Sequence, residues 1–233
     1  MKKKAQKSMR NLKKYSNHSG YSVNESLGKI VSICKTENHV HYEGRPYTHK
    51  IEYLQSDGNQ WVNTEIVPTT NTVAEGNFMY TKFVAYGAIL SNYISENHNV
   101  YRIILTNSSG NVYFCCNTKA GGGSVSTTCS LGAKHSFTLD STGLTIDGVK
   151  KAGSAVNGTA NNTELVLFTN KLTEPTIRDI GCTIYDLKIY ESGVLVRDMY
   201  PVRVGQVGYM YDKISKRLFG NSGTGTFTLG PDV

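Results

Sequence analysis

The sequence predicts an all-β fold, a two-sheet antiparallel jelly-roll sandwich preceded by a basic N-terminal arm. The 233 residues include 23 Gly and 15 Tyr but only 5 Pro. Tyr and Thr favour strands, whereas Gly and Asn favour tight turns. Short β-type runs alternate with turn signals at roughly 8–15 residues, without a convincing helical period, which is typical of a sandwich or jelly roll.

Residues 1–50 are predicted to form a basic attachment and oligomerisation arm that includes a linker. They carry eleven Lys and Arg against three Asp and Glu, whereas residues 51–233 carry fourteen against fifteen. The pattern allows a short helix through residues 5–15 and one strand over residues 29–34. Such a segment cannot bury a core of its own, so we expect it to order on a partner surface or a second copy.

From Ile51 onward, the sequence predicts ten short β runs bounded by turn residues. The runs are residues 51–54, 60–64, 72–80, 101–105, 111–116, 135–139, 143–146, 165–169, 183–190 and 194–199. Asp147-Gly148 and Ser192-Gly193 are typical of tight hairpin turns. Pro201 is expected to end the last run, because proline cannot donate to a strand ladder.

Two motifs in residues 51–233 resemble those of one known domain family. Residues 52–66, EYLQSDGNQWVNTEI, resemble its entry motif, and residues 188–203, KIYESGVLVRDMYPVR, resemble its exit motif. The family occurs in phage structural proteins and gut-bacterial surface proteins, and it belongs to the concanavalin A-like, laminin-G-like jelly rolls. The resemblance implies two antiparallel sheets packed face to face, with residues 208–227 as a closing hairpin.

No motif for catalysis is evident, so we expect a protein that is not an enzyme. A retaining glycosidase needs two carboxylates ~5–5.5 Å apart, and no strand-like run places two acids on one face. No G-x-S-x-G motif marks a nucleophilic serine, although a Ser-His-Asp site stays open on composition. The acids Asp140, Asp147, Asp198 and Asp212 are expected to be solvated, in turns or at strand ends.

Neither a cofactor nor a metal site is predicted. His39 and His41 share one face of an extended segment, but a zinc site needs further ligands. No acid-rich run typical of calcium occurs, although a site assembled from several loops stays open. The five cysteines lack C-x-x-C spacing, so we expect free, buried or half-buried thiols. They are Cys34, Cys115, Cys116, Cys129 and Cys182.

The first fourteen residues carry seven basic side chains and no acid, a pattern typical of interaction tails. We expect the arm to anchor the protein to other virion proteins through charged and apolar side chains. These are Lys2, Lys3, Lys4, Lys7, Arg10, Lys13, Lys14, Ile30, Val31 and Ile33. Nucleic acid is a less favoured partner, because only Tyr15 interleaves with the charges and no recognition fold follows.

Taken with the family resemblance, these patterns lead us to expect a non-enzymatic phage virion protein, either a head fibre or decoration protein or a fibre tip, assembled in the host cytoplasm as a homo-oligomer. No signal peptide is recognisable after the basic start, and no apolar run approaches the ~18–20 residues of a membrane span. The alternatives are a carbohydrate-binding module, a glycoside hydrolase-related protein, a bacterial surface adhesin, or a secreted host protein that has lost its leader.

Host or mucosal glycans are candidate ligands of the predicted jelly roll. The apolar faces of tyrosine rings stack on sugars, and loops at the ends of such sandwiches are exposed. Tyr86, Tyr93 and Tyr101 are the candidate glycan-binding residues, because Ser and Asn residues surround them.

Overall fold

A computed structural model describes residues 39–40, 46–85, 87–92, 99–106, 109–119, 125–153, 162–169 and 181–233. All ten predicted anchoring residues of the arm lie outside these ranges, as do Tyr86 and Tyr93. The backbone of Tyr101 belongs to a described strand, but its side chain lies outside the description. The arm, its partners and the three glycan-binding tyrosines therefore stay predictions.

The larger of two antiparallel sheets contains twelve strands, with β14 and β5 near its centre. Its main path runs β1 (His39–Val40), β17 (Arg217–Phe219), β16 (Val207–Asp212), β15 (Val194–Val204), β14 (Gly181–Glu191), β5 (Thr72–Lys82), β10 (Lys134–Asp140), β11 (Gly143–Ile146) and β12 (Val149–Ala152). β3 (Leu54–Ser56) pairs with β14 and with β18 (Thr228–Leu229), and β2 (His49–Lys50) pairs with β15.

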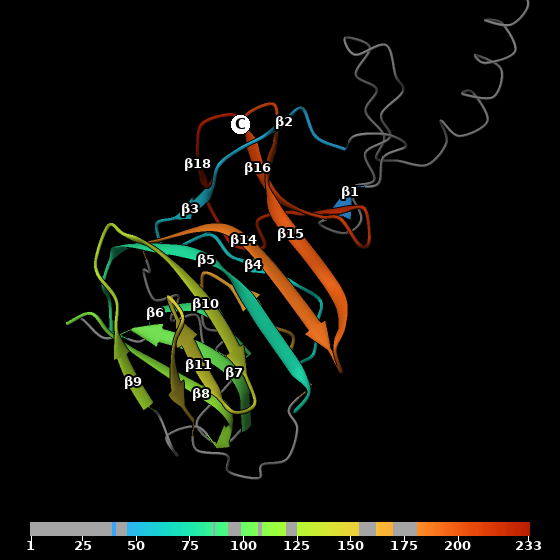
Figure 1. Cartoon of the computed structure of the whole chain (residues 1–233). Coiled ribbons are helices and arrows are strands. Elements are labelled where there is room, and N and C mark those ends of the chain that lie inside the picture. Colours follow the sequence, from blue (N-terminus) through green and yellow to red (C-terminus); the bar gives the residue numbers. More distant parts are fainter. Residues whose placement is uncertain are drawn as a thin grey trace, which may run out of the picture.

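The smaller sheet contains six strands. Its order is β4 (Val62–Asn63), β13 (Val166–Leu167), β6 (Gly87–Ser91), β7 (Asn99–Thr106), β8 (Asn111–Lys119) and β9 (Val125–Thr128). Figure 1 shows it beside β10 and β11, whereas β15 and β16 extend away from it. The described residues form strands and turns without a helix, so the predicted antiparallel sandwich is confirmed. No helix that could span a bilayer occurs among them.

A continuous apolar core joins the two sheets. Phe78, Leu139 and Ile184 from the larger sheet belong to the same cluster of fully buried side chains as Ile89 and Phe114 from the smaller one. Burying each such side chain stabilises the fold by about 1.5–3 kcal/mol. Buried and half-buried residues alternate along β5, and the buried Ala74, Phe78 and Tyr80 lie in this core. The other half of β5 therefore faces outward.

The predicted turns have the expected backbone. Asp147 and Gly148 have φ values of 49° and 80°, and Ser192 and Gly193 have 50° and 80°. Positive φ at both central positions defines the hairpin turns that match strand twist. They join β11 to β12 and β14 to β15.

The prediction that Pro201 ends its strand is wrong, since β15 continues to Val204. The carbonyl of Pro201 accepts a hydrogen bond from the backbone N–H of Ile51 at 3.2 Å, on the side away from β16. The N and C=O of one residue point to the same side of a strand. The missing N–H of Pro201 therefore faces away from β16, beside Ile51 and beyond the end of β2 at Lys50, so the ladder with β16 continues to Val204.

Two strands from the segment before Ile51 pair with the larger sheet. β1 pairs with β17, and β2 pairs with β15. Between them, the Tyr47 ring packs against Tyr200 and Tyr211. The end of the predicted arm is thus part of the sheet, while the proposed division at residue 50 stays a prediction.

Two of the five cysteines are described, and both are free and buried. Burial raises the pKa of Cys129 to about 12, with a smaller contribution from Asp147, and raises the pKa of Cys182 further. The prediction of buried free thiols is confirmed for these two, and Cys34, Cys115 and Cys116 lie outside the description of side chains.

Candidate functional site

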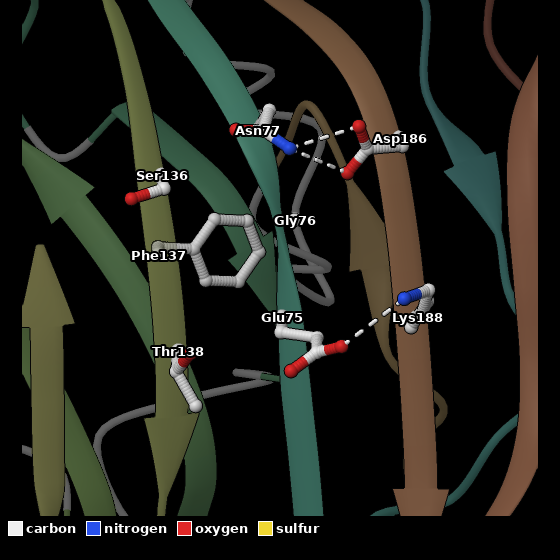
Figure 2. A pocket seen from close by; sticks show the side chains of 8 residues that line it. All are labelled: Glu75, Gly76, Asn77, Ser136, Phe137, Thr138, Asp186 and Lys188. Atoms are coloured by element: carbon white, nitrogen blue, oxygen red, sulfur yellow. Dashed lines mark hydrogen bonds and ion pairs between the residues drawn. The ribbon is translucent and has the colours of Figure 1, made fainter. Parts of the chain in front are cut away.

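A shallow hollow of about 210 Å³ lies on the solvent-facing side of β10, β5 and β14. We call it the outer-face hollow. Its lining residues are Glu75, Gly76, Asn77, Ser136, Phe137, Thr138, Asp186 and Lys188. Figure 2 shows that Glu75 and Asn77 on β5 point toward β14, with Ser136 and Thr138 on the neighbouring strand β10. Three strands distant in sequence therefore build one polar surface.

Strand alternation places these polar side chains outward. On β5, Glu75 and Asn77 are half-buried, while their neighbours Ala74 and Phe78 are fully buried. Because successive side chains of a strand point to opposite faces, Glu75 and Asn77 share the outer face. Each also lies opposite an outward residue of β14, since Glu75 pairs with Lys188 and Asn77 pairs with Asp186.

An irregularity in β14 decides which residue lies opposite Asn77. The register between β14 and β5 shifts between Ile184 and Asp186. A bulge of this kind inserts one extra residue and re-aims the side chains that follow it. Without the shift, Tyr185 would lie opposite Asn77, so the bulge brings Asp186 into the hollow.

Hydrogen bonds hold the polar side chains in place. The Asn77 amide Nδ2 lies 3.0 and 2.9 Å from the two carboxylate oxygens of Asp186. The Lys188 Nζ donates to Glu75 Oε1 at 3.5 Å, and the Tyr190 hydroxyl donates to the same oxygen at 3.0 Å. The bond to Glu75 raises the pKa of Tyr190, and the charges of Tyr190 and Glu75 raise the pKa of Lys188.

This arrangement suits a small ligand that both donates and accepts hydrogen bonds. A carboxylate accepts only, an ammonium donates only, and a hydroxyl does both. The volume of about 210 Å³ is below the ~300–1,000 Å³ of pockets for drug-sized molecules. Two carboxylates and one ammonium leave the lining with a net charge of −1. The hollow therefore favours a small, polar and uncharged or cationic group.

Half-buried aromatic rings continue the surface along β14. Tyr190 follows Lys188 at the next outward position and reaches Glu75. At the bulge, Tyr185 packs edge-on against Tyr53, with centroids 5.8 Å apart, and Lys134 Nζ lies 4.0 Å from the Tyr185 centroid. An aromatic ring beside polar groups offers an apolar face and a polar edge to one ligand.

The outer-face hollow was not predicted from the sequence. Neither Asp186 nor Glu75 is among the candidate residues predicted from the sequence. The two acids are 111 positions apart, and only the pairing of β5 with β14 brings them to one face. A usable signal was present, because residues 74–78 and 186–190, within two predicted runs, alternate polar with apolar or small residues.

One of the four acids expected to be solvated is buried. Asp212, at the end of β16, has no exposed surface and accepts hydrogen bonds from the backbone N–H groups of Asp198, Ile214 and Ser215. The turn after β16 folds back over its carboxylate, and the guanidinium of Arg197 lies 3.7 Å away. The expectation was wrong for Asp212 because these donors replace water.

No group of three His, Cys, Asp or Glu side chains is placed to hold a metal ion within the described ranges. His39 and His41, considered for such a site, lie where side chains are not described.

Neither a protein-family model nor a curated protein matches the sequence. Solved structures match the fold. A chain described as "a putative carbohydrate binding protein" from Bacteroides ovatus matches with a TM-score of 0.53 and 13% identity, over 77% of this chain and 60% of that one. At this identity the match shows the fold alone.

Two enzymes also match, more weakly. A Trypanosoma rangeli sialidase has a TM-score of 0.41 and 8% identity, over 73% of this chain and 30% of that one. The alginate lyase AlgAT5, of polysaccharide lyase family 7, has a TM-score of 0.34 and 11% identity, over 75% and 84%. Our expectation that the protein is not an enzyme is corrected by these matches, because chains of similar structure include enzymes. They point to no particular reaction.

Proposed function

We propose that the jelly roll binds a neutral carbohydrate at the outer-face hollow. The observation that carries this proposal is the row of paired polar side chains on β5 and β14, with Asn77 on Asp186 and Lys188 on Glu75. Sugars present adjacent hydroxyl groups, each able to donate to a carboxylate and to accept from an amide or ammonium. The fold shared with the Bacteroides ovatus chain described as "a putative carbohydrate binding protein" supports the same ligand class.

The charge of the hollow selects among carbohydrates. Glu75 and Asp186 outnumber the single cation Lys188, so a carboxylated or sulfated sugar would meet like charge. The Tyr190 ring, next to this row, offers an apolar face to one side of a sugar ring. A neutral hexose or an amino sugar fits both features.

The hollow is small and open, so we expect weak binding at each site. Display of many copies would convert weak single-site binding into strong attachment through multivalency. We therefore propose that the protein is a homo-oligomer displayed on a phage virion and attached by residues 1–50. Mass spectrometry of purified virions tests the location, and light scattering of the purified full chain tests the oligomeric state.

The binding proposal is tested first with a glycan array, using the full chain. Asp186→Asn removes a charge from the hollow with little change of shape, and Asp57→Asn is the matched control in an exposed turn. Hydrogen bonds to charged groups contribute about 1.5–3 kcal/mol, so Asp186→Asn should weaken binding by roughly 10- to 100-fold. The control should bind like the unmodified protein. Equal affinity of the two variants would place the ligand elsewhere, and an array without any binder would remove the proposal.

A further inference from the structure

A second constellation of polar residues lies at the edge of the β10–β11 hairpin. We propose that Ser130, His135 and Asp147 form a nucleophilic site that attacks carboxylic esters, with Ser130 as the nucleophile. This goes beyond carbohydrate binding and does not depend on it, since none of the three residues lines the outer-face hollow.

The three side chains form a chain of short contacts. His135 Nδ1 lies 2.6 Å from Asp147 Oδ2, and His135 Nε2 lies 3.1 Å from Ser130 Oγ. The order acid, imidazole and hydroxyl is the arrangement in which an imidazole acts as general base toward a serine. Contacts of ~2.6–3.2 Å are within the reach that general-base catalysis requires.

The hairpin turn orients the acid. Asp147 occupies the first position of the Asp147-Gly148 turn, and its second oxygen, Oδ1, accepts a hydrogen bond from the Ser136 N–H at 2.8 Å. With Oδ1 held by β10, Oδ2 is directed at His135 on the same strand. The turn and the strand pairing thus place the carboxylate without a bond to Ser130.

The position of the imidazole proton follows from these contacts. Partial burial opposes ionisation of Asp147, but the hydrogen bonds from His135 and Ser136 lower the pKa of its carboxyl overall. An ionised carboxylate can only accept, so His135 must carry a proton on Nδ1. The Ser130 N–H donates to Nε2 at 3.2 Å, which agrees with a lone pair on that nitrogen.

The base His135 is buried, whereas the hydroxyl of Ser130 is accessible to solvent. His135 is about nine-tenths buried, and its ring lies against Phe78 with centroids 5.7 Å apart. Ser130 is exposed, so a reagent can reach the hydroxyl while the base is shielded. The neighbouring thiol of Cys129 is not the nucleophile, since burial raises its pKa to about 12 and keeps it protonated at neutral pH.

The reaction balances with these groups alone. The Ser130 oxygen bonds to the ester carbonyl carbon, and its proton moves to His135 Nε2. The C–O bond to the alcohol breaks, and the alkoxide leaves with that proton. Water then hydrolyses the acyl-serine by the same route. While Nε2 carries the proton, the Ser130 carbonyl oxygen, 3.2 Å away, can accept a hydrogen bond from it.

The experiment treats the full chain with an alkyl fluorophosphonate, followed by peptide mapping. Here the Ser130 oxygen bonds to phosphorus, fluoride leaves, and the serine proton passes through His135 to solvent. Ser130 should react at least ~100-fold faster than Ser192, an exposed serine without a base, because a positioned base contributes ~10²–10⁴-fold. Ser130→Ala should remove this label and slow p-nitrophenyl acetate hydrolysis. Equal labelling of Ser130 and Ser192 would overturn the proposal.

Asp147 is a positioning residue, and its test needs a readout that loss of structure would not mimic. The groups in contact with His135 are Asp147, Ser130 and the Phe78 ring. Asp147→Asn should slow labelling of Ser130 at least ~10-fold and leave the rate at Ser192 unchanged, because only Ser130 depends on the oriented imidazole. An unchanged rate at Ser130 would contradict the assignment.

If Asp147→Asn fails to fold, the proposal is tested on the unmodified protein. Nitrogen NMR of the His135 ring distinguishes its two neutral tautomers. We expect the proton on Nδ1, and a neutral ring protonated on Nε2 would overturn the proposal, because Nε2 could then not accept the Ser130 proton.

Discussion

Two regions on the outer face of the larger sheet differ in what covers them. The outer-face hollow on β10, β5 and β14 is open and lined by polar and charged side chains. On β15, β16 and β17 the same face carries a second apolar cluster, which we call the tyrosine cluster. It contains buried Val202, Tyr211 and Leu218, packed with Tyr47, Tyr200, Val204 and Tyr209.

A segment of the same chain, the one around Tyr47, covers the tyrosine cluster and leaves the outer-face hollow open. Tyr47 lies on the tyrosine cluster, and its hydroxyl is 2.8 Å from that of Tyr200. Lys50 and Lys213 each place their Nζ 5.3 Å from the centroid of the Tyr200 ring. A face covered by its own chain becomes a small core, whereas a face that stays uncovered is available to a ligand. We therefore expect substitutions in the tyrosine cluster to lower the stability of the protein, and substitutions in the outer-face hollow to lower its affinity for a ligand.

Leu218→Ala should produce the largest effect. Leu218 is fully buried in the tyrosine cluster, and replacing a buried leucine by alanine costs about 2–5 kcal/mol. Urea denaturation of the full chain measures the loss. Leu131→Ala is the matched control, because Leu131 is 53% exposed and should change stability by less than ~0.5 kcal/mol. Similar losses for both variants would mean that the cluster is not a second core.

Gly76→Ala tests the floor of the outer-face hollow. A Cβ at Gly76 would lie 2.4 Å from the backbone oxygen of Asp186 and 3.1 Å from Phe137 Cε1. Since the first contact is backbone, β14 must move, and overpacking of this kind costs about 1–3 kcal/mol. We expect amide NMR shifts concentrated around Asp186. Shifts confined to β5 would show that β14 does not contact this position.

Tyr47→Ala removes the cover from the tyrosine cluster. The loss of the hydroxyl contact with Tyr200 and of the ring contact with Tyr211, at 5.3 Å, should destabilise the protein by about 1–2 kcal/mol. Tyr47→Phe keeps the ring and should lose less than half of that amount. If the two variants are equally destabilised in urea, the hydroxyl contact rather than the ring packing holds the segment.

Asp186→Asn should have the smallest effect on stability, within ~0.5 kcal/mol, because Asp186 is half-exposed and amide and carboxylate have the same shape. Its effect on carbohydrate affinity should be large, as expected if the outer-face hollow serves binding and the tyrosine cluster serves stability. A stability loss above ~1 kcal/mol would assign Asp186 to the structure instead.

The sequence by itself determined where several strands and two hairpin turns lie. β5, β10, β11 and β14 lie within or next to predicted runs, since alternation and strand propensity are carried by neighbouring residues. The Asp147-Gly148 and Ser192-Gly193 turns follow from residues that tolerate positive φ. β6 was not predicted, because Gly87–Ser91 is buried throughout and does not alternate.

Only the tertiary structure decided which residues come together in the two candidate sites. The hollow requires β5 to pair with β14 across more than 100 residues, with a bulge that places Asp186 opposite Asn77. The contacts of His135 with Ser130 and with Asp147 require the start of β10 to lie between the loop before it and the hairpin turn after β11. Strand register and bulges depend on packing against the whole core, and no short sequence window contains that information.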